Sequence, residues 1–553
     1  MKDWWEGCAV PSMRREAHFG DRVVRCFTSR ARSLHELFAS AVARHGEDEA
    51  LVCAGARWSW RGLDERVGRV AGGLREHGVT RGDRVVLFVS NRPEFVVALF
   101  AIQRLGAIAV PVGTREQRPG LSWIIGHCGA RAVFHDAELA DRLPEAGEGA
   151  QAALLRVSCG AAGPAIASVE VAAIGSGTDA ASDGGTNAAL ASTGEAAIES
   201  LASAASALRY SVPFEALEGS APLREAAAVR EEDPAVILYT SGTTGKPKGA
   251  MLTHLNIVHS AMHFAACMQL SHEDRSLLAV PASHVTGLIA NIVAFVSVGG
   301  AVVMMPSFKA REFLDLAAGE RITHTLMVPA MYNLLLLQPD LSGFDLAAWR
   351  LGGYGGAPMP VATIDALAAR LPGLVLLNAY GATETTSPTT MMPAGLTREH
   401  ADSVGVALPC AEVLVVDDEG CELPPGEAGE LWITGPMVVR GYWNDAAATA
   451  REFTAGWWHS GDLGSVDADG FVRVFDRKKD MLNRGGYKIY SVEVENVIAS
   501  MPGVVEAAVV GRPCPVLGER VHVFVHAPGV AITEQGVRAF CAERLADYKV
   551  PET

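Results

Sequence analysis

The chain has 553 residues, of which 49% are hydrophobic and 20% charged, and its formal net charge is −16. This length exceeds the size at which one hydrophobic core keeps growing, so we expect at least two domains. The acidic balance argues against nucleic acid or an anionic membrane as a partner, because such binding needs a basic surface. The ten cysteines show no CxxC pair and no His/Cys cluster at zinc spacing, so we expect no disulfide framework and a cytoplasmic protein.

Helical and strand patterns alternate along much of the chain. The expected helices lie at residues 63–78 and 93–106, and the expected strands at 84–90, 107–112, 130–136, 235–240 and 373–381. Continuous apolar strands between helices are typical of a parallel sheet covered on both faces. The sequence therefore predicts an α/β fold.

Two segments depart from this pattern. Residues 157–208 contain no Lys, Arg or aromatic residue and are rich in alanine, so we interpret residues 150–225, approximately, as a flexible or loosely packed insertion. The apolar run at 287–305 is long enough to cross a membrane, but Gly299 and Gly300 split it into a helix-length piece and a short strand. We therefore expect a buried core there, and no integral membrane segment.

The pattern changes again after residue 408. Short strands and turns predict a β-rich subdomain, and a basic run at 476–480 precedes a small α+β tail. We place the boundary near residue 478, which gives a large domain at 1–478 and a small domain at 479–553.

The stretch SGTTGKPKG, residues 241–249, has the composition of a phosphate-binding loop. It is not a Walker A sequence, because Pro247 follows Lys246 and proline has no N–H to give a phosphate. Strand-like runs flank it on both sides, so we expect a loop between two strands. Backbone N–H groups, hydroxyls and ammonium groups of this loop suit a polyphosphate; the residues expected to supply them are Thr240, Ser241, Gly242, Thr243, Thr244, Gly245, Lys246 and Lys248.

Eight motifs in one order resemble those of the adenylate-forming superfamily, in its acyl-CoA synthetase branch. They are YTSGTTGKPKG, PASHVTG (281–287), GGYGGAPMP (352–360), AYGATET (379–385), GELWITGP (429–436), WHSGDLG (458–464), DRKKDMLNRGGYKIYSVEVE (476–495) and DYKVP (547–551). The resemblance implies a large N-terminal domain and a small mobile C-terminal domain. It also implies attack of a carboxylate on ATP to give an acyl-adenylate, followed by attack of a thiol, with ATP, Mg²⁺ and coenzyme A as cofactors.

The resemblance also assigns roles to residues around the nucleotide. Glu384 matches the Mg²⁺ ligand, which suits a hard cation, and Thr383 matches an α-phosphate contact. The nucleoside is assigned to Tyr380 for stacking the adenine, to Gly355, Gly356 and Ala357 for its edge, and to Asp462 and Arg477 for the ribose. The groups expected to act in catalysis are Thr240, Lys246, His284, Thr383 and Glu384.

Three further roles come from the same resemblance. His284 matches the residue near the acyl carbonyl, although a lone His in an apolar stretch is more often a core residue. Lys479 matches the hinge at which the small domain turns between the two half-reactions. Gly485 and Gly486 match the loop that lines the pantetheine channel.

The family carries a lysine shortly after the YKVP element, and the sequence stops at Thr553 before that position. We expect the sequence to be truncated, and this form to adenylate slowly while still converting an acyl-adenylate and CoA into a thioester. A second departure is Cys514, where relatives commonly carry Asp.

The substrate is expected to be a carboxylic acid with an apolar body, either a medium-to-long fatty acid or a carbocyclic or aromatic acid. Met327, Val328, Met331 and Tyr332 offer no cation for a second carboxylate. Two alternatives remain open: an acyl-AMP ligase that loads a carrier protein, and a degenerate acyl- or nucleotide-binding protein. The sequence leaves the oligomeric state open, a homodimer included.

Overall fold

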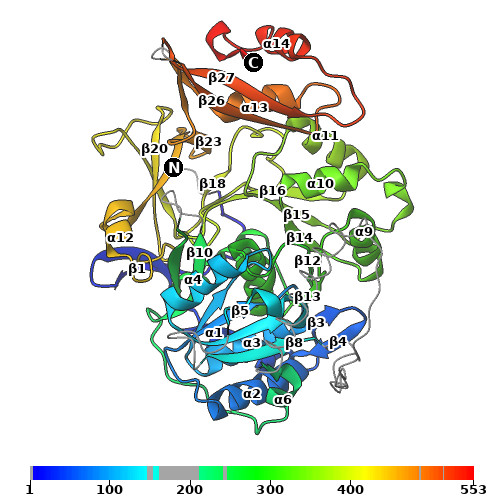
Figure 1. The fold of residues 1–553 in the computed structure, drawn as a ribbon, viewed down its shortest axis with the longest axis vertical. Helices are drawn as coiled ribbons and strands as arrows, with labels where there is room; N and C mark the ends of the chain where they lie inside the picture. The colour runs from blue at the N-terminus through cyan, green and yellow to red at the C-terminus, as the bar shows by residue number, and fades with distance from the viewer. Residues whose placement is uncertain (1–3, 146–153, 161–210, 241–245, 485–486, 515) are drawn as a thin grey trace, which may run out of the picture.

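The computed structural model describes residues 4–145, 154–160, 211–240, 246–484, 487–514 and 516–553. A seven-stranded and a nine-stranded sheet form the large part of the molecule, together with a five-stranded sheet. A four-stranded sheet with two helices stands at the opposite end of the long axis (Figure 1).

The seven-stranded sheet has the order β11-β10-β6-β5-β7-β8-β9. Its strands are β5 (Arg84–Phe88), β6 (Ile108–Pro111), β7 (Ala130–Asp136), β8 (Leu155–Cys159), β9 (Ser211–Pro213), β10 (Pro234–Thr240) and β11 (Lys248–Thr253). All neighbours are parallel except β11, which pairs antiparallel with β10. The predicted parallel α/β sheet is thus confirmed, and strands flank residues 241–247 on both sides as predicted, since β10 ends at Thr240 and β11 begins at Lys248.

The nine-stranded sheet has the order β18-β17-β16-β15-β14-β12-β13-β3-β4. Its strands are β3 (Glu49–Cys53), β4 (Ala56–Ser59), β12 (Arg275–Leu278), β13 (Ala301–Met304), β14 (His324–Met327), β15 (Leu351–Tyr354), β16 (Val375–Tyr380), β17 (Thr390–Met391) and β18 (Val406–Ala407). The six strands from β16 to β3 are joined by five pairings, and all five are parallel. Parallel strands place their carboxyl ends at one edge, where ligands of open α/β sheets bind.

Helices cover both large sheets. They are α1 (Leu34–His45), α2 (Trp60–Glu76), α3 (Pro93–Arg104), α4 (Arg118–Cys128), η1 (Ala137–Arg142), α6 (Phe214–Glu218), α7 (His254–Cys267), η3 (Thr286–Val293), α8 (Ala294–Val298), α9 (Ala310–Gly319), α10 (Pro329–Leu336), η4 (Leu341–Gly343) and α11 (Val361–Arg370). Strand β5 shows how both faces are used, because Val85 and Leu87 join the main core while Val86 and Phe88 join a second core with α4. Successive side chains of a strand point to opposite faces, which explains the unbroken apolar run.

The β-rich and C-terminal parts follow in chain order. They contain β19 (Glu412–Val416), β20 (Gly429–Thr434), α12 (Ala446–Glu452), β21 (Phe453–Thr454), β22 (Trp457–Val466), β23 (Val472–Arg477), β24 (Leu482–Arg484), β25 (Tyr487–Ile489), α13 (Ser491–Ala499), β26 (Glu506–Cys514), β27 (Gly518–His526), α14 (Glu534–Ala542) and η5 (Asp547–Lys549). Strand β23 belongs to the five-stranded sheet, and β24 belongs to the four-stranded one. The Asp476 carboxylate accepts the Ser491 N–H at 2.5 Å, so a buried acid connects the two parts. The boundary near residue 478 stays a prediction.

The apolar run at 287–305 divides as the glycine pair indicates. It forms the π-helical η3, then α8, then β13, and Gly299 ends α8 in the left-handed region at φ 79°. Among the residues that the structure describes, none of the helices has both the length and the apolar character needed to cross a membrane.

The predicted alanine-rich insertion is narrower than residues 150–225. Residues 155–159 form β8 and residues 211–218 form β9 and α6, because their apolar side chains extend the sheet beyond β7. Residues 161–210, which carry most of the predicted insertion, lie outside the described residues.

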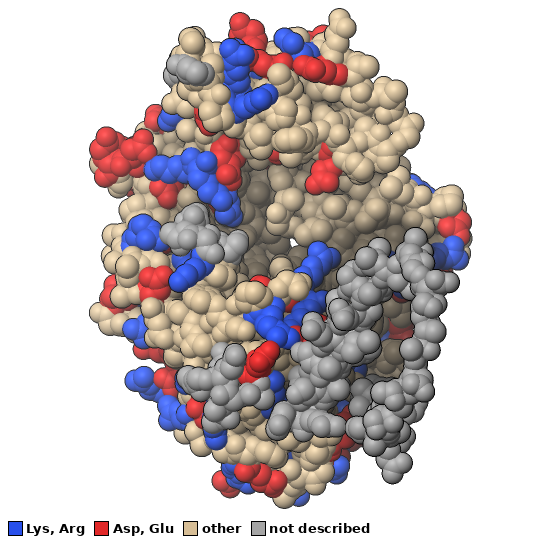
Figure 2. All heavy atoms as spheres, in the orientation of Figure 1, with Lys and Arg blue, Asp and Glu red and all other residues tan. Residues whose placement is uncertain are grey.

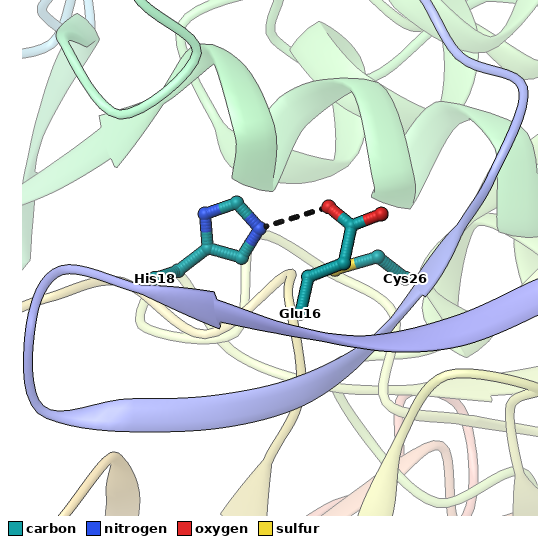
Figure 3. A group of neighbouring side chains, drawn as sticks. All are labelled: Glu16, His18 and Cys26. Atoms are coloured by element: carbon teal, nitrogen blue, oxygen red, sulfur yellow. Dashed lines mark ion pairs between the residues drawn. The ribbon is translucent and has the colours of Figure 1, made fainter.

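The chain begins with a hairpin of β1 (Met13–His18) and β2 (Arg22–Phe27) that lies against the large part of the molecule. Figure 3 shows Glu16, His18 and Cys26 on one side of this hairpin, with potential ligand atoms within 4.8 Å of one another. Arg30 donates to both oxygens of Glu16, at 3.2 and 2.7 Å, and to Glu231 at 2.9 Å. Because a guanidinium already neutralises the Glu16 carboxylate, we interpret the cluster as an ion-pair network that docks the hairpin, rather than as a metal site.

Candidate active site

A cavity of about 250 Å³ lies where strand ends of the two large sheets meet. Thr240 at the end of β10, Pro247 of the loop, His284 and Thr383 all line it. Its apolar wall includes Val112, Ile124, Leu238 and Val285. The structure therefore brings together residues from three of the sequence motifs. Figure 2 shows a hollow in the face of the molecule, about midway along its long axis.

The phosphate-binding segment is framed by its two strands. Thr240 and Lys248 are register partners in the antiparallel pair of β10 and β11. Of the predicted loop residues, Ser241, Gly242, Thr243, Thr244 and Gly245 lie outside the described residues. Lys246 is exposed, whereas the Lys248 side chain is only 12% exposed and is ion-paired with Glu452 at 2.7 Å.

Glu384 lies in the turn that follows β16. Its side chain is 7% exposed, and its Oε1 accepts a hydrogen bond from the Tyr442 hydroxyl at 2.9 Å. Burial raises the pKa of the Glu384 carboxyl above its ordinary value. Thr386, two residues on, adopts a left-handed φ of 53° that non-glycine residues rarely take, which marks this turn as strained.

The donor set at Glu384 fits Mg²⁺. A carboxylate oxygen is the hard ligand that this ion prefers, and the neighbouring residue Thr383 lines the cavity. A desolvated carboxylate also gains most from a nearby cation, because burial penalises its free charge. Glu384 would hold the ion there, while Thr383 would contact a phosphate oxygen.

The predicted nucleoside residues lie together at the carboxyl end of β16. The Tyr380 hydroxyl donates to Asp462 Oδ2 at 2.5 Å, and Arg477 Nε lies 3.3 Å from Asp462 Oδ1. Burial raises the pKa of the Asp462 carboxyl, although Tyr380 and Arg477 both favour its charged form. Residues 82 positions apart in sequence thus form one acceptor site.

The backbone of residues 355–357 lies beside this group. A side chain at Gly355 would place its Cβ 2.3 Å from the carbonyl oxygen of Ala379, so only glycine allows this approach of β15 to β16. Gly356 has a φ of 78°, again in the left-handed region, and Ala357 is exposed. An exposed backbone edge beside Tyr380 is consistent with the predicted wall for a planar base.

His284 stands at the entrance to η3 and lines the cavity. Gly287 fixes this turn, since a Cβ there would lie 2.2 Å from the carbonyl oxygen of Pro281. Burial first, and then the charge of Arg115, lower the pKa of the His284 imidazole. The side chain is thus kept neutral at pH values where an exposed histidine begins to protonate.

The predicted hinge residue lies between β23 and β24. Lys479 is exposed in the turn between these strands, where no regular ladder holds the backbone. Gly485 and Gly486 lie outside the described residues. Their neighbour Arg484 is ion-paired with Glu552 at 2.8 Å.

Sequence reasoning did not identify Tyr442 and Glu452. The Tyr442 hydroxyl reaches Glu384 and also Glu452 Oε2, at 2.6 Å. One signal was present: Lys248 sits on a strand between apolar residues, so its charge needs a counter-ion. The sequence could not choose that counter-ion among 63 acidic residues.

Comparison with known proteins agrees with this geometry. The family model described as "AMP-binding enzyme" matches residues 38–443, and "AMP-binding enzyme C-terminal domain" matches residues 493–553. A feruloyl-CoA synthase from Amycolatopsis sp. is 33% identical over 516 residues, covering 93% of this chain and 91% of the relative. A long-chain-fatty-acid–CoA ligase from Escherichia coli O6:H1 is 31% identical over 530 residues, covering 95% and 91%.

Solved structures give the same result. The o-succinylbenzoate CoA synthetase of Bacillus subtilis, in complex with its acyl-adenylate intermediate, is 26% identical and has a TM-score of 0.77, covering 95% of this chain and 94% of that one. The same enzyme with ATP and a magnesium ion is 25% identical, with a TM-score of 0.76 and 95% of each chain covered. The predicted resemblance is confirmed: the chain belongs to the family of AMP-binding, adenylate-forming enzymes, among its acyl-CoA synthetases.

Proposed function

We propose that this protein couples a carboxylic acid with an apolar body to coenzyme A, at the expense of ATP, through an acyl-adenylate. The observation that carries the proposal is the cavity that Thr240, Pro247, His284 and Thr383 line together, with the buried Glu384 next to Thr383 in the chain. Such a site holds an acid next to the phosphates of a nucleotide. Reaction then depends mainly on positioning and on neutralisation of charge.

The chain's own residues divide this work. Tyr380, Asp462 and residues 355–357 orient the nucleoside, and the segment from Thr240 to Lys246 holds the β- and γ-phosphates as they become pyrophosphate. Mg²⁺ bound at Glu384 would supply neutralisation of the phosphate charge. The neutral His284 imidazole orients the acid without adding a competing cation. Turning at Lys479 then brings Gly485 and Gly486 to the thiol.

The cavity wall supports an apolar acid. Val112, Ile124, Leu238 and Val285 offer no charge, and the acidic group among its lining residues, Glu116, would repel a second carboxylate. The two relatives named above act on a feruloyl group and on long-chain fatty acids, according to their names. We propose an aromatic or a medium-to-long-chain acid, and we expect dicarboxylates and amino acids to react poorly.

Pyrophosphate release from ATP, measured across these four classes of acid with and without CoA, tests the proposal. We expect an apolar acid to release pyrophosphate and to consume one CoA thiol for each acyl group. Lys246→Met should slow pyrophosphate release. The control is Lys309→Met, which should not slow it, because Lys309 only forms a surface ion pair with Glu312. Pyrophosphate release without thiol consumption would instead indicate a ligase that loads a carrier protein. Nucleotide binding with no release for any acid would indicate a binding protein.

A further inference from the structure

The Tyr442 hydroxyl lies at the centre of a buried group of charges beside the active site. It is 2.9 Å from Glu384 Oε1, 2.6 Å from Glu452 Oε2 and 3.4 Å from Lys248 Nζ. Lys248 Nζ also lies 4.5 Å from the centre of the Tyr442 ring, which favours a cation. Tyr442 therefore contacts both the predicted Mg²⁺ ligand and the end of the phosphate-binding segment.

The two carboxylates are not equally supplied with donors. Glu452 receives Lys248 Nζ on both oxygens, at 2.7 Å each, and Arg451 at 2.8 Å. Within the described part of the chain, Tyr442 is the side chain that donates a hydrogen bond to Glu384. A tyrosine hydroxyl has one proton, so it can serve one acceptor at a time. Glu384 is thus the carboxylate whose orientation depends on Tyr442.

The backbone holds Tyr442 between the two partners. Trp443 N–H donates to Gly249 O at 2.7 Å, and Met251 N–H donates to Gly441 O at 3.1 Å, which ties this segment to β11. On its other side, Val439 N–H donates to Glu384 O at 2.9 Å. The segment from 439 to 443 thus connects β11 to the Glu384 turn. A displacement of β11 would therefore be transmitted to the Glu384 turn, and a displacement of that turn to β11.

We propose that Tyr442 and Glu452 are positioning residues for magnesium-bound ATP: Tyr442 orients the Glu384 carboxylate, and Glu452 engages Lys248 so that this lysine supports the network instead of binding a phosphate. The ammonium of Lys246, which is exposed and has no ion pair within the described ranges, is the one left for the phosphates. This inference rests on the proposed function, in that it assigns nucleotide binding to this cleft. It also revises the sequence expectation for Lys248.

Four variants of the full chain test the proposal: Tyr442→Phe, Glu452→Gln, Lys248→Met and the control Glu320→Gln. Glu320 is a half-buried carboxylate ion-paired with Arg275 at 2.7 Å, at the amino end of β12, away from the cleft. Two quantities are measured: the Mg²⁺ concentration that gives half-maximal pyrophosphate release, and the dissociation constant of ATP in EDTA. Thermal unfolding identifies any variant that fails to fold. If Lys248→Met fails to fold, Lys248→Gln takes its place.

Tyr442→Phe should raise the half-maximal Mg²⁺ concentration about tenfold, because it removes a hydrogen bond to a charged group. ATP binding in EDTA should stay within about twofold, since no phosphate contact is lost. Glu452→Gln and Lys248→Met should each shift the Mg²⁺ dependence in the same direction as Tyr442→Phe. A variant that carries both Glu452→Gln and Lys248→Met should shift it no further, because each change removes the same ion pair. Glu320→Gln should match the wild type.

Two results would overturn the proposal. If Lys248→Met weakens ATP binding in EDTA about tenfold while Glu452→Gln strengthens it or leaves it unchanged, then Lys248 binds a phosphate. If Tyr442→Phe leaves the Mg²⁺ dependence unchanged, then Tyr442 does not orient Glu384. Failure of the proposed function would give another result, because no acid would then release pyrophosphate with the wild type. The effect of Mg²⁺ on ATP binding would still show whether Tyr442 and Glu452 orient Glu384 and Lys248.

Discussion

Replacement of Asp462 by Asn tests the predicted ribose site directly. The buried carboxylate accepts from Tyr380 at 2.5 Å, and the amide oxygen of Asn can still accept that bond. The ion pair with Arg477 is lost, but the Arg477 side chain is 58% exposed, so this pair contributes at most about 1 kcal/mol. The main loss is therefore the negative charge offered to the ligand.

The size of that loss follows from the hydrogen bonds to the ribose. A bond to a charged acceptor contributes about 1 kcal/mol more than a bond to a neutral one. Two ribose hydroxyls on one carboxylate give about 2 kcal/mol, which corresponds to about a 30-fold fall in kcat/KM for ATP. Stability should change little, because the neutral amide removes the cost of burying a charge as it removes the ion pair.

The assay is pyrophosphate release at saturating acid, with ATP and with 2′-deoxy-ATP. The wild type should prefer ATP about tenfold, whereas Asp462→Asn should lose most of this preference, because the group that reads the hydroxyl is weakened. The Tyr380→Phe variant serves as a second perturbation of the same carboxylate from the protein side. If Asp462→Asn keeps the full preference for ATP over the deoxynucleotide, the assignment of Asp462 to the ribose is wrong.

Three further predictions address the framework of the site. Gly355→Ala should weaken AMP binding at least tenfold in equilibrium titration, because its Cβ would lie 2.3 Å from Ala379 O and push the two strands apart. Hydrogen bonding from Arg30 holds the pKa of the Glu16 carboxyl at about 2, against an ordinary 4.5. The contribution of this carboxylate to the free energy of unfolding is therefore full above pH 4.5 and declines as the pH falls toward 2. In denaturant unfolding, Glu16→Gln should lack this decline. Asn291 is fully buried, accepts from Ser276 and donates to the carbonyl oxygen of Thr286, so Asn291→Leu should lower the free energy of unfolding by about 2–3 kcal/mol in the same measurement.

Much of the architecture follows from local patterns. The apolar run of β5 predicts a strand buried on both faces, and Val85 and Val86 do lie in different cores. The glycine pair at 299–300 predicts the end of a helix, which Gly299 confirms with its left-handed φ. Such features depend on a few neighbouring residues. They are therefore readable without knowledge of the rest of the chain.

The pairings inside the site are of another kind. Tyr380 and Asp462 were each predicted as nucleotide contacts, but their mutual hydrogen bond joins residues 82 positions apart and depends on how β22 reaches the end of β16. The ion pair between Lys248 and Glu452 spans 204 positions. No local pattern selects one carboxylate among many at that distance. The edges of the alanine-rich segment differ from the prediction for a similar reason, since β8 pairs with β7 and β9 pairs in turn with β8.

These pairings also explain how a protein of net charge −16 presents a site to ATP, which is itself an anion. Lys248 is neutralised by Glu452, and Lys478 by Asp418 and Glu430 at 3.0 and 3.3 Å, so the cations nearest to acidic groups contribute little field to the cleft. Lys246 and Lys479 are exposed, and no ion pair is found for either among the residues that the structure describes. If the predicted roles of Lys246 and Lys479 hold, attraction of the nucleotide depends on these exposed cations rather than on the charge of the surface as a whole.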